Sequence, residues 1–235
     1  RYASRGLGDV YKRQILWSMN LPDRIQDLNY NLLKLSSLVE TNIKDAFSAI
    51  EEKDLDKSQI VINVDSKINR MEVEIEKEVN EIIENFHPTD SDLRYLLAAL
   101  KINNELERIG DYATNIARNT QFMVEHPDLE LPKILSHSAE TLTSMLNDVI
   151  NAFILSDEAK AFEVIEMDDI IDNNNREIFT LFKEKTKSNS AFLRQFIVFT
   201  NISRYVERAA DHTTNIAEDI IFQINGKIVR HDETI

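Results

Sequence analysis

The chain contains no cysteine, and it holds only four glycines and four prolines in 235 residues. The lack of cysteine excludes disulfides, thiolate metal sites and cysteine nucleophiles, and it fits a reducing compartment. The scarcity of glycine and proline argues against a β-rich fold, which needs many turns, and predicts an all-α protein of long helices. No apolar run approaches the roughly 18 residues that a transmembrane helix requires.

Positive charge is also in short supply. With 27 basic and 41 acidic residues, the formal net charge is −14, and we expect no nucleic-acid partner because such a surface repels phosphate backbones. Residues 1–14, "RYASRGLGDVYKRQ", are the exception, with four basic side chains, two of the four glycines and no helical periodicity. We interpret this segment as a non-native tail and leave it out of the fold.

Apolar residues recur at steps of three and four through most of the remaining chain, as in amphipathic helices. Proline-marked breaks such as "HPTDSD" and "HPDLELP" divide the pattern into six helices. They are expected at about 22–51, at 61–86, from the end of the "HPTDSD" break to about 125, and at about 132–155, 158–187 and 191–225. The arrangement predicts two tandem antiparallel three-helix bundles, over residues 20–125 and 126–231. Helices of roughly 40–50 Å would make the molecule elongated.

An internal repeat supports the two bundles. The stretch "ERIGDYATNIAR" at 107–118 returns as "ERAADHTTNIAE" at 207–218. Seven of the fourteen positions are identical between 105–118 and 205–218. Ala210 stands where the first copy has Gly110, a difference that we expect to alter packing only slightly.

Acidic side chains interrupt the apolar stripe in both halves. In the third expected helix the stripe passes from Leu100 to Asn104, Glu107 and Asp111 without leaving its face, because steps of three and four keep side chains aligned. The sixth helix repeats this pattern, and the second and fifth carry matching acids. The candidate metal ligands are Asp65, Glu72, Glu107 and Asp111 in the first half and Asp168, Asp172, Glu207 and Asp211 in the second.

A single pair of helical acids is most often exposed surface. Here the acids continue an apolar stripe and recur in both halves, and like charges on half-buried faces repel unless a cation compensates. Arg108 and Arg208 project about 100° from the preceding glutamates, so we expect them to pair with neighbouring chain or solvent. The oxygen-rich set therefore predicts bound iron, manganese, magnesium or calcium, with zinc as a further candidate.

Enzyme chemistry has weak support. A di-iron carboxylate site needs two Glu-x-x-His pairs, and the chain has one such spacing, from Glu84 to His87 at a helix end. His212 has Tyr112 as its counterpart in the repeat, so we interpret it as a packing or surface residue. No glycine-rich phosphate loop and no nucleophile with a base are suggested by spacing, so we expect no catalytic residue.

Several segments resemble a known family. "ELERIGDYATNIA" and "YVERAADHTTNIAEDIIF", the latter followed by "INGKIVRH", resemble the two signature segments of the PhoU family. "VDSKINRMEVEIE" and "MDDIIDNNNREIF" resemble its remaining motifs, and the resemblance covers residues 22–231 in order. The family's acidic motif falls on Glu107/Asp111, Glu207/Asp211 and Asp168/Asp172, while at Asp65/Asn69 an asparagine replaces the second acid.

The resemblance implies a cytoplasmic, non-enzymatic accessory of phosphate uptake that self-associates as a homodimer or higher homo-oligomer and is peripheral to the membrane at most. It implies metal clusters or single ions on the acidic motifs, with iron, zinc or manganese ahead of magnesium or calcium. It further implies a relay from the phosphate ABC transporter to a sensor histidine kinase, which silences the phosphate-starvation response when phosphate is plentiful.

Two other functions stay open at this point. One is the soluble C-terminal regulatory module of a sodium–phosphate cotransporter, and the other is a carboxylate-bridged metal enzyme. A metal that only stabilises the bundles, without a sensing role, is a further interpretation of the same acids.

Overall fold

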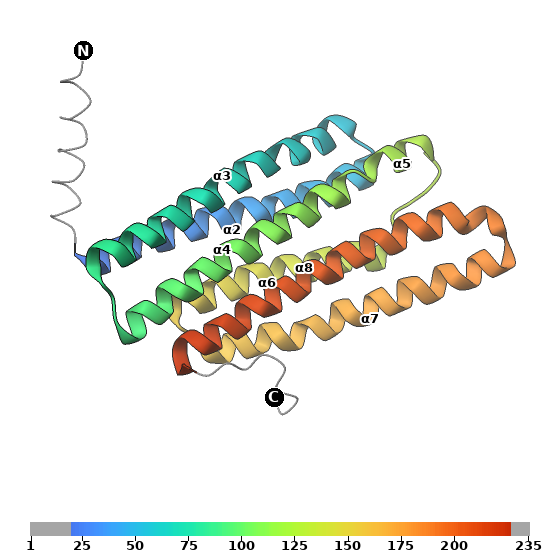
Figure 1. Ribbon diagram of the computed structural model, residues 1–235. Helices are drawn as coiled ribbons and strands as arrows, with labels where there is room; N and C mark the ends of the chain where they lie inside the picture. Colours follow the sequence, from blue (N-terminus) through green and yellow to red (C-terminus); the bar gives the residue numbers. More distant parts are fainter. Residues whose placement is uncertain (1–19, 227–235) are drawn as a thin grey trace, which may run out of the picture.

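The computed structural model describes residues 20–226, and this part of the chain is built from long helices without a strand (Figure 1). The expected all-α fold of two tandem three-helix bundles is confirmed, while the expected tail at 1–14 and the last residues of the expected second bundle, 227–231, lie outside the described residues. Within residues 20–226 no helix is both long and apolar enough to cross a membrane. The elements are α2 (Leu21–Glu52), α3 (Leu55–Phe86), α4 (Asp90–Ala117), the short α5 (Thr120–Glu125), α6 (Lys133–Leu155), α7 (Glu158–Ser188), a 3₁₀ turn (Ser190–Phe192) and α8 (Leu193–Asn225).

The first turn of each bundle is built in the same way. Lys53 and Ser156 take left-handed backbone conformations, with φ of 57° and 50°, and end α2 and α6. The next residues, Asp54 and Asp157, cap the following helices by accepting hydrogen bonds from backbone N–H groups three residues on. The cap at Asp54 explains why α3 begins at Leu55, six residues before the apolar stripe from which its start was predicted.

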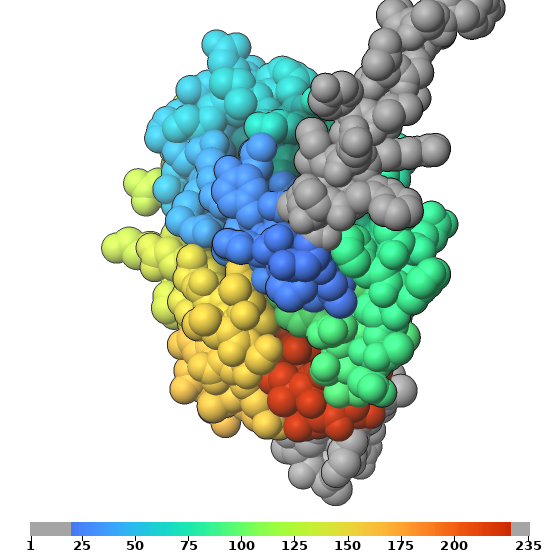
Figure 2. Space-filling model, turned by 90° about the vertical axis from the view of Figure 1, so that its left-hand side faces the viewer, coloured from blue at the N-terminus to red at the C-terminus, as the bar shows by residue number. Residues whose placement is uncertain are grey.

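The six long helices share one continuous core. α2, α3 and α4 form the first bundle, and α6, α7 and α8 form the second. The bundles meet where α4 packs on α8 and α2 packs on α6, which leaves α3 and α7 on the two outer edges (Figure 1). Figure 2 shows one end of the molecule, where the beginnings of α2 and α4 lie beside the ends of α6 and α8. Residues from both halves, such as Leu32, Leu106, Leu142 and Val206, are fully buried.

The third expected helix is interrupted, because α4 ends at Ala117 and α5 begins only at Thr120. Side chains donate hydrogen bonds to the backbone carbonyl groups at the end of α4. Ser58 Oγ donates to the Ala117 carbonyl at 2.8 Å, and Asn119 Nδ2 donates to the carbonyls of Asn115 and Ile116 at 2.8 and 3.2 Å. These bonds compete with continuation of the helix, a tertiary and local effect that apolar spacing does not report.

Candidate functional site

In the first bundle, the packing of α3 against α4 brings the predicted acids together. Asn103 on α4 donates from its amide to the backbone carbonyl of Glu72 on α3 at 2.9 Å, which fixes the register of the two helices. Gly110 allows a close approach at the same level, since a Cβ there would lie 2.9 Å from Cδ1 of Ile68. The side chains of Asp65, Glu72, Glu107 and Asp111 are all half-buried along this seam.

Electrostatic repulsion is the main property of this first acidic cluster. Burial, the charge of Asp111 and the more distant charges of Glu72 and Asp65 raise the pKa of Glu107. Burial and the charge of Asp65 likewise raise the pKa of Asp111, which in its protonated form hydrogen-bonds to Asp65. Burial, followed by the charge of Glu76, raises the pKa of Glu72. The four acids thus favour partial protonation or a compensating cation.

The second bundle repeats this arrangement between α7 and α8. Ser203, the counterpart of Asn103, donates to the side-chain oxygen of Asn175 at 2.8 Å. Burial and the charges of Asp211 and Asp172 raise the pKa of Asp168 to about 7. Burial, followed by the charges of Asp211 and Asp172, raises the pKa of Glu207. Burial, followed by the charge of Asp172, raises the pKa of Asp211.

Buried carboxylate oxygens test whether these clusters fit a metal ion. Oδ1 of Asp65 and Oδ1 of Asp168 are buried without a hydrogen-bond partner, and the two residues are counterparts in the repeat. An unpaired buried carboxylate oxygen is costly, and hard divalent cations prefer such ligands. The donor set therefore fits a cation. Within residues 20–226 no three potential ligands are already arranged around one metal position, and the metal sites stay a prediction.

The arginines beside the acidic motifs behave differently in the two bundles. Contrary to expectation, Arg108 does not pair only with neighbouring chain or solvent, because its guanidinium lies 3.5 Å from Glu107 and 3.8 Å from Asp111 of its own helix. The expectation used only the direction in which each Cβ leaves the helix. A long arginine side chain can bend back along its own helical turn and reach these acids. Among residues 20–226, Arg208 has no ion pair within 4.0 Å, although it is the counterpart of Arg108.

Among the described residues, 20–226, no histidine belongs to either acidic cluster, although the electrostatic interaction with His212 acts to lower the pKa of Asp211. His87 is the C-cap of α3, at the end of the helix. His212 pairs through Nδ1 with Glu105 of α4, and its Nε2 lies 3.5 Å from the Tyr112 hydroxyl. It therefore joins the two bundles, in agreement with the packing interpretation.

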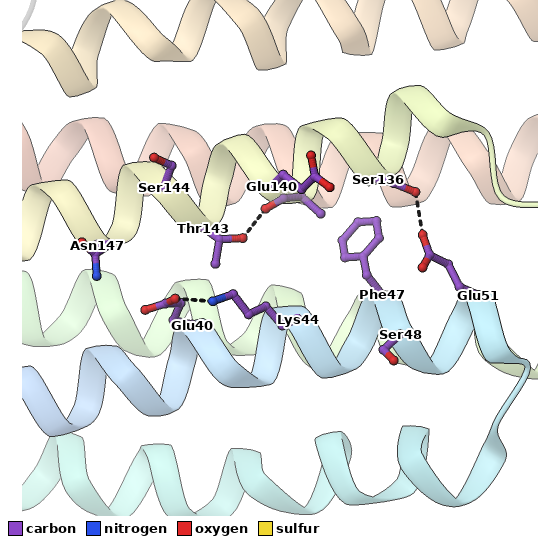
Figure 3. A pocket seen from close by; sticks show the side chains of 11 residues that line it. Glu40, Lys44, Phe47, Ser48, Glu51, Ser136, Glu140, Thr143, Ser144 and Asn147 are labelled. Atoms are coloured by element: carbon purple, nitrogen blue, oxygen red, sulfur yellow. Dashed lines mark hydrogen bonds and ion pairs between the residues drawn. The ribbon is translucent and has the colours of Figure 1, made fainter.

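Two surface hollows were not predicted from the sequence. One, of about 540 Å³, lies between α7 and α8 beside the second acidic cluster and is lined by Arg176, Arg204 and Arg208. The other, of about 510 Å³, lies between α2 and α6 around Phe47 (Figure 3). A comparison of the repeats position by position could have shown the arginines, because Val73 and Asn104 stand at the counterparts of Arg176 and Arg204.

Comparisons with known proteins agree with this geometry. A family model described as the PhoU domain matches residues 32–120 and again 135–220. A phosphate-specific transport system accessory protein PhoU homolog of Clostridium acetobutylicum is 30% identical over 206 residues, which cover 87% of this chain and 94% of that protein. The Aquifex aeolicus homolog is 31% identical over 91% of this chain and 96% of its own length.

Solved structures show the same fold. The crystal structure of PhoU from Pseudomonas aeruginosa superimposes with a TM-score of 0.82 at 27% identity, over 88% of this chain and all of that chain. The phosphate transport system regulatory protein PhoU from Streptococcus pneumoniae superimposes with a TM-score of 0.84 at 25% identity, over 89% of this chain and 99% of that one.

Proposed function

This chain belongs to the PhoU family, and from that premise we propose that it is a metal-binding regulatory adaptor of phosphate uptake. The family model matches both halves of the chain, and the relatives that it resembles over most of their length are named accessory proteins of phosphate-specific transport. In this proposal the protein is not an enzyme. It links the phosphate ABC transporter to a sensor histidine kinase in the cytoplasm and suppresses the phosphate-starvation response when phosphate is abundant.

The metal-binding part of the proposal is supported chiefly by two buried carboxylate oxygens without a hydrogen-bond partner, Oδ1 of Asp65 and Oδ1 of its repeat counterpart Asp168. Asp65 with Glu72, Glu107 and Asp111 would hold cations in the first bundle, and Asp168 with Asp172, Glu207 and Asp211 in the second. Iron, zinc and manganese are the first candidates, and magnesium and calcium are alternatives. Burial and mutual repulsion raise the pKa values of these acids, and a bound cation would compensate their negative charge. It would also link α3 to α4 in the first bundle and α7 to α8 in the second.

Self-association and docking at the membrane transporter complete the proposal. The acidic faces lie along the seams of α3 with α4 and of α7 with α8, so a cation there would stiffen the surfaces that those helices present to a partner. A homodimer or higher homo-oligomer would double the number of such surfaces. Family membership supports these proposals, and binding measurements can test each of them separately.

Metal content tests the sites directly. Protein purified without chelator would be analysed by mass spectrometry as wild type, as Glu107→Ala/Glu207→Ala, and as Glu74→Ala/Glu166→Ala. The control acids lie on α3 and α7 but are exposed and outside both clusters. We expect at least one metal ion per chain in the wild type and in the control, and a loss in the first variant. Equal metal content in all three would overturn the assignment.

Complementation tests the adaptor role. A Pseudomonas aeruginosa strain that lacks its own PhoU homolog would receive this chain together with a phosphate-starvation reporter. We expect the wild type to restore repression at high phosphate, and the Glu107→Ala/Glu207→Ala variant to restore it less. Two failures together would contradict the adaptor role in this host. The folded wild-type chain would not repress the reporter, and in a pull-down from that strain it would bind neither the transporter nor the kinase.

A further inference from the structure

The hollow between α7 and α8 gathers three guanidinium groups from two helices. Arg176 comes from α7, and Arg204 and Arg208 come from successive turns of α8. The hollow measures about 540 Å³, which is much larger than the roughly 30 Å³ that one water occupies in the liquid. Its volume therefore leaves room for a polyatomic ligand.

The corresponding face of the first bundle has the opposite charge balance. Counterparts of the α7 residues 175, 176 and 179 are Glu72, Val73 and Glu76, where α7 has Asn175, Arg176 and Phe179. The counterpart of Arg204 is Asn104. The second face thus gains two cations and loses two acids relative to the first, and it loses one cation, because Lys77 is the counterpart of the lining residue Thr180. Both bundles use the same helix packing, so the fold itself does not require this difference in charge.

Two of the three guanidinium groups form no ion pair within 4.0 Å among the residues that the structure describes. Arg176 pairs with Asp172 at 2.9 Å. Within residues 20–226, neither Arg204 nor Arg208 has an ion pair within 4.0 Å. At longer range the positive charges of both act to lower the pKa of Glu207. Like charges one helical turn apart repel each other, so an anion between them would be stabilising.

The lining also includes neutral hydrogen-bonding side chains and one apolar ring. Asn175 accepts from the buried Ser203 through its side-chain oxygen, which orients its amide, and its Nδ2 group has no partner among the described residues. Phe179 forms an apolar wall and packs against Phe196, with ring centroids 5.5 Å apart. Planar guanidinium groups and amide N–H groups are the donors that recognise tetrahedral oxyanions in proteins.

The hollow between α2 and α6 provides a comparison within the same molecule. There Lys44 pairs with Glu40 at 2.5 Å, and Glu51 accepts a hydrogen bond from Ser136 at 2.6 Å (Figure 3). Its single cation is already neutralised by a neighbouring acid. The site between α7 and α8 differs in that two of its lining cations, Arg204 and Arg208, form no ion pair within 4.0 Å among the described residues.

We propose that the hollow between α7 and α8 binds a phosphoryl oxyanion, held by Arg176, Arg204 and Arg208 with the amide of Asn175. Two carboxylates of the second acidic cluster, those of Glu207 and Asp211, also line the hollow. They repel an anion when ionised and free, so a cation on that cluster strengthens phosphoryl binding without being required for the site to exist. The inference goes beyond the proposed adaptor role and stands on the side chains of α7 and α8 alone.

Exchange of residues between the repeats tests the proposal with little risk to folding. The variant Arg176→Val/Arg204→Asn carries the first bundle's residues at exposed positions of the second. The control, Arg70→Val/Arg108→Asn, removes two cations from the first bundle and changes the net charge equally. Circular dichroism would confirm that both variants remain folded.

Equilibrium dialysis with radiolabelled inorganic phosphate, at constant ionic strength and both with chelator and with Mg²⁺, gives the readout. We expect saturable binding to the wild type and to the control in at least one of the two conditions, and about tenfold weaker binding to Arg176→Val/Arg204→Asn. Absence of saturable binding to the wild type in both conditions, or equal affinities of all three proteins, would overturn the site.

Competition by O-phosphoserine distinguishes two sources of the phosphoryl group. If phosphoserine displaces phosphate from the wild type at equal or lower concentration, the site accepts a phosphorylated side chain. If it displaces phosphate only at higher concentration, the site prefers the free anion. Both results support an oxyanion site. Because dialysis needs no transporter or kinase, its failure is separate from failure of the adaptor role.

Discussion

The ammonium group of Lys101 on α4 lies 2.8 Å from a carboxylate oxygen of Asp219 on α8, at the seam where the two bundles meet. Asp219 is almost completely buried, with 3% of its side chain exposed. The same ammonium group lies 5.1 Å from the centre of the Phe222 ring. The two central helices are therefore joined by charge as well as by apolar packing.

Removal of this ion pair should destabilise the chain. We expect Lys101→Ala to lower the free energy of unfolding by about 1–3 kcal/mol, because the buried Asp219 carboxylate loses a cationic partner. Urea unfolding followed by circular dichroism would measure the change. Lys67→Ala, an exposed lysine on α3, serves as the control and should change the free energy of unfolding by less than about 0.5 kcal/mol. Equal effects of the two substitutions would contradict the interpretation.

Gly110 offers a prediction about packing. A Cβ at this position would lie 2.9 Å from the Cδ1 atom of Ile68, the movable end of that side chain. We expect Gly110→Ala to change the free energy of unfolding by less than about 1 kcal/mol, since the contact cost offsets the gain in helix propensity, as Ala210 in the second bundle suggests. Gly110→Val should cost about 1–3 kcal/mol more through overpacking. Urea unfolding would test the pair, and equal losses for both would contradict this account.

Stability of the metal-free chain should depend on pH. In the folded chain the pKa of Asp168 rises to about 7, chiefly through burial, while an unfolded aspartate has a pKa of about 3.9. Between these values the folded state keeps a proton that the unfolded state has released. The free energy of unfolding should therefore fall as pH rises from about 4 to about 7. The raised pKa values of Glu107, Asp111 and Glu207 act in the same direction.

Urea midpoints measured in chelator across this pH range would test the prediction. Asp168→Asn removes the titrating group and should flatten the dependence. A free energy of unfolding that rises over the range, or an unchanged slope in the variant, would show that Asp168 ionises normally in the folded chain.

Added cation should reverse that pH dependence. A metal that binds only the folded chain adds about 2.7 kcal/mol at a free concentration one hundred times its dissociation constant. Protons compete with the metal for the carboxylates, so the gain should grow as pH rises. Melting curves with and without Mn²⁺ would show it as an increase in Tm. Asp65→Asn/Asp168→Asn should lose the increase, and an equal increase in that variant would place the metal elsewhere.

Much of the fold could be predicted from residue spacing. Helix positions and the acidic faces follow from steps of three and four, because a helix places residues i, i+3 and i+4 on one side whatever packs against it. The repeat of "ERIGD" as "ERAAD" shows that the same helix was used twice. Local turn chemistry was harder to predict, since the capping bonds of Asp54 and the break at Asn119 depend on individual side-chain contacts.

The sequence by itself determined that the chain is helical, duplicated and acidic along one face of four helices, because these properties depend on periodicity within single segments. The tertiary structure alone decided which charges meet. It buried Asp168 beside Asp211, paired Lys101 with Asp219 over 118 positions, and brought Arg176, Arg204 and Arg208 to the lining of one hollow. Such contacts arise from the register and crossing of separate helices, which packing of the whole core sets and no local pattern encodes.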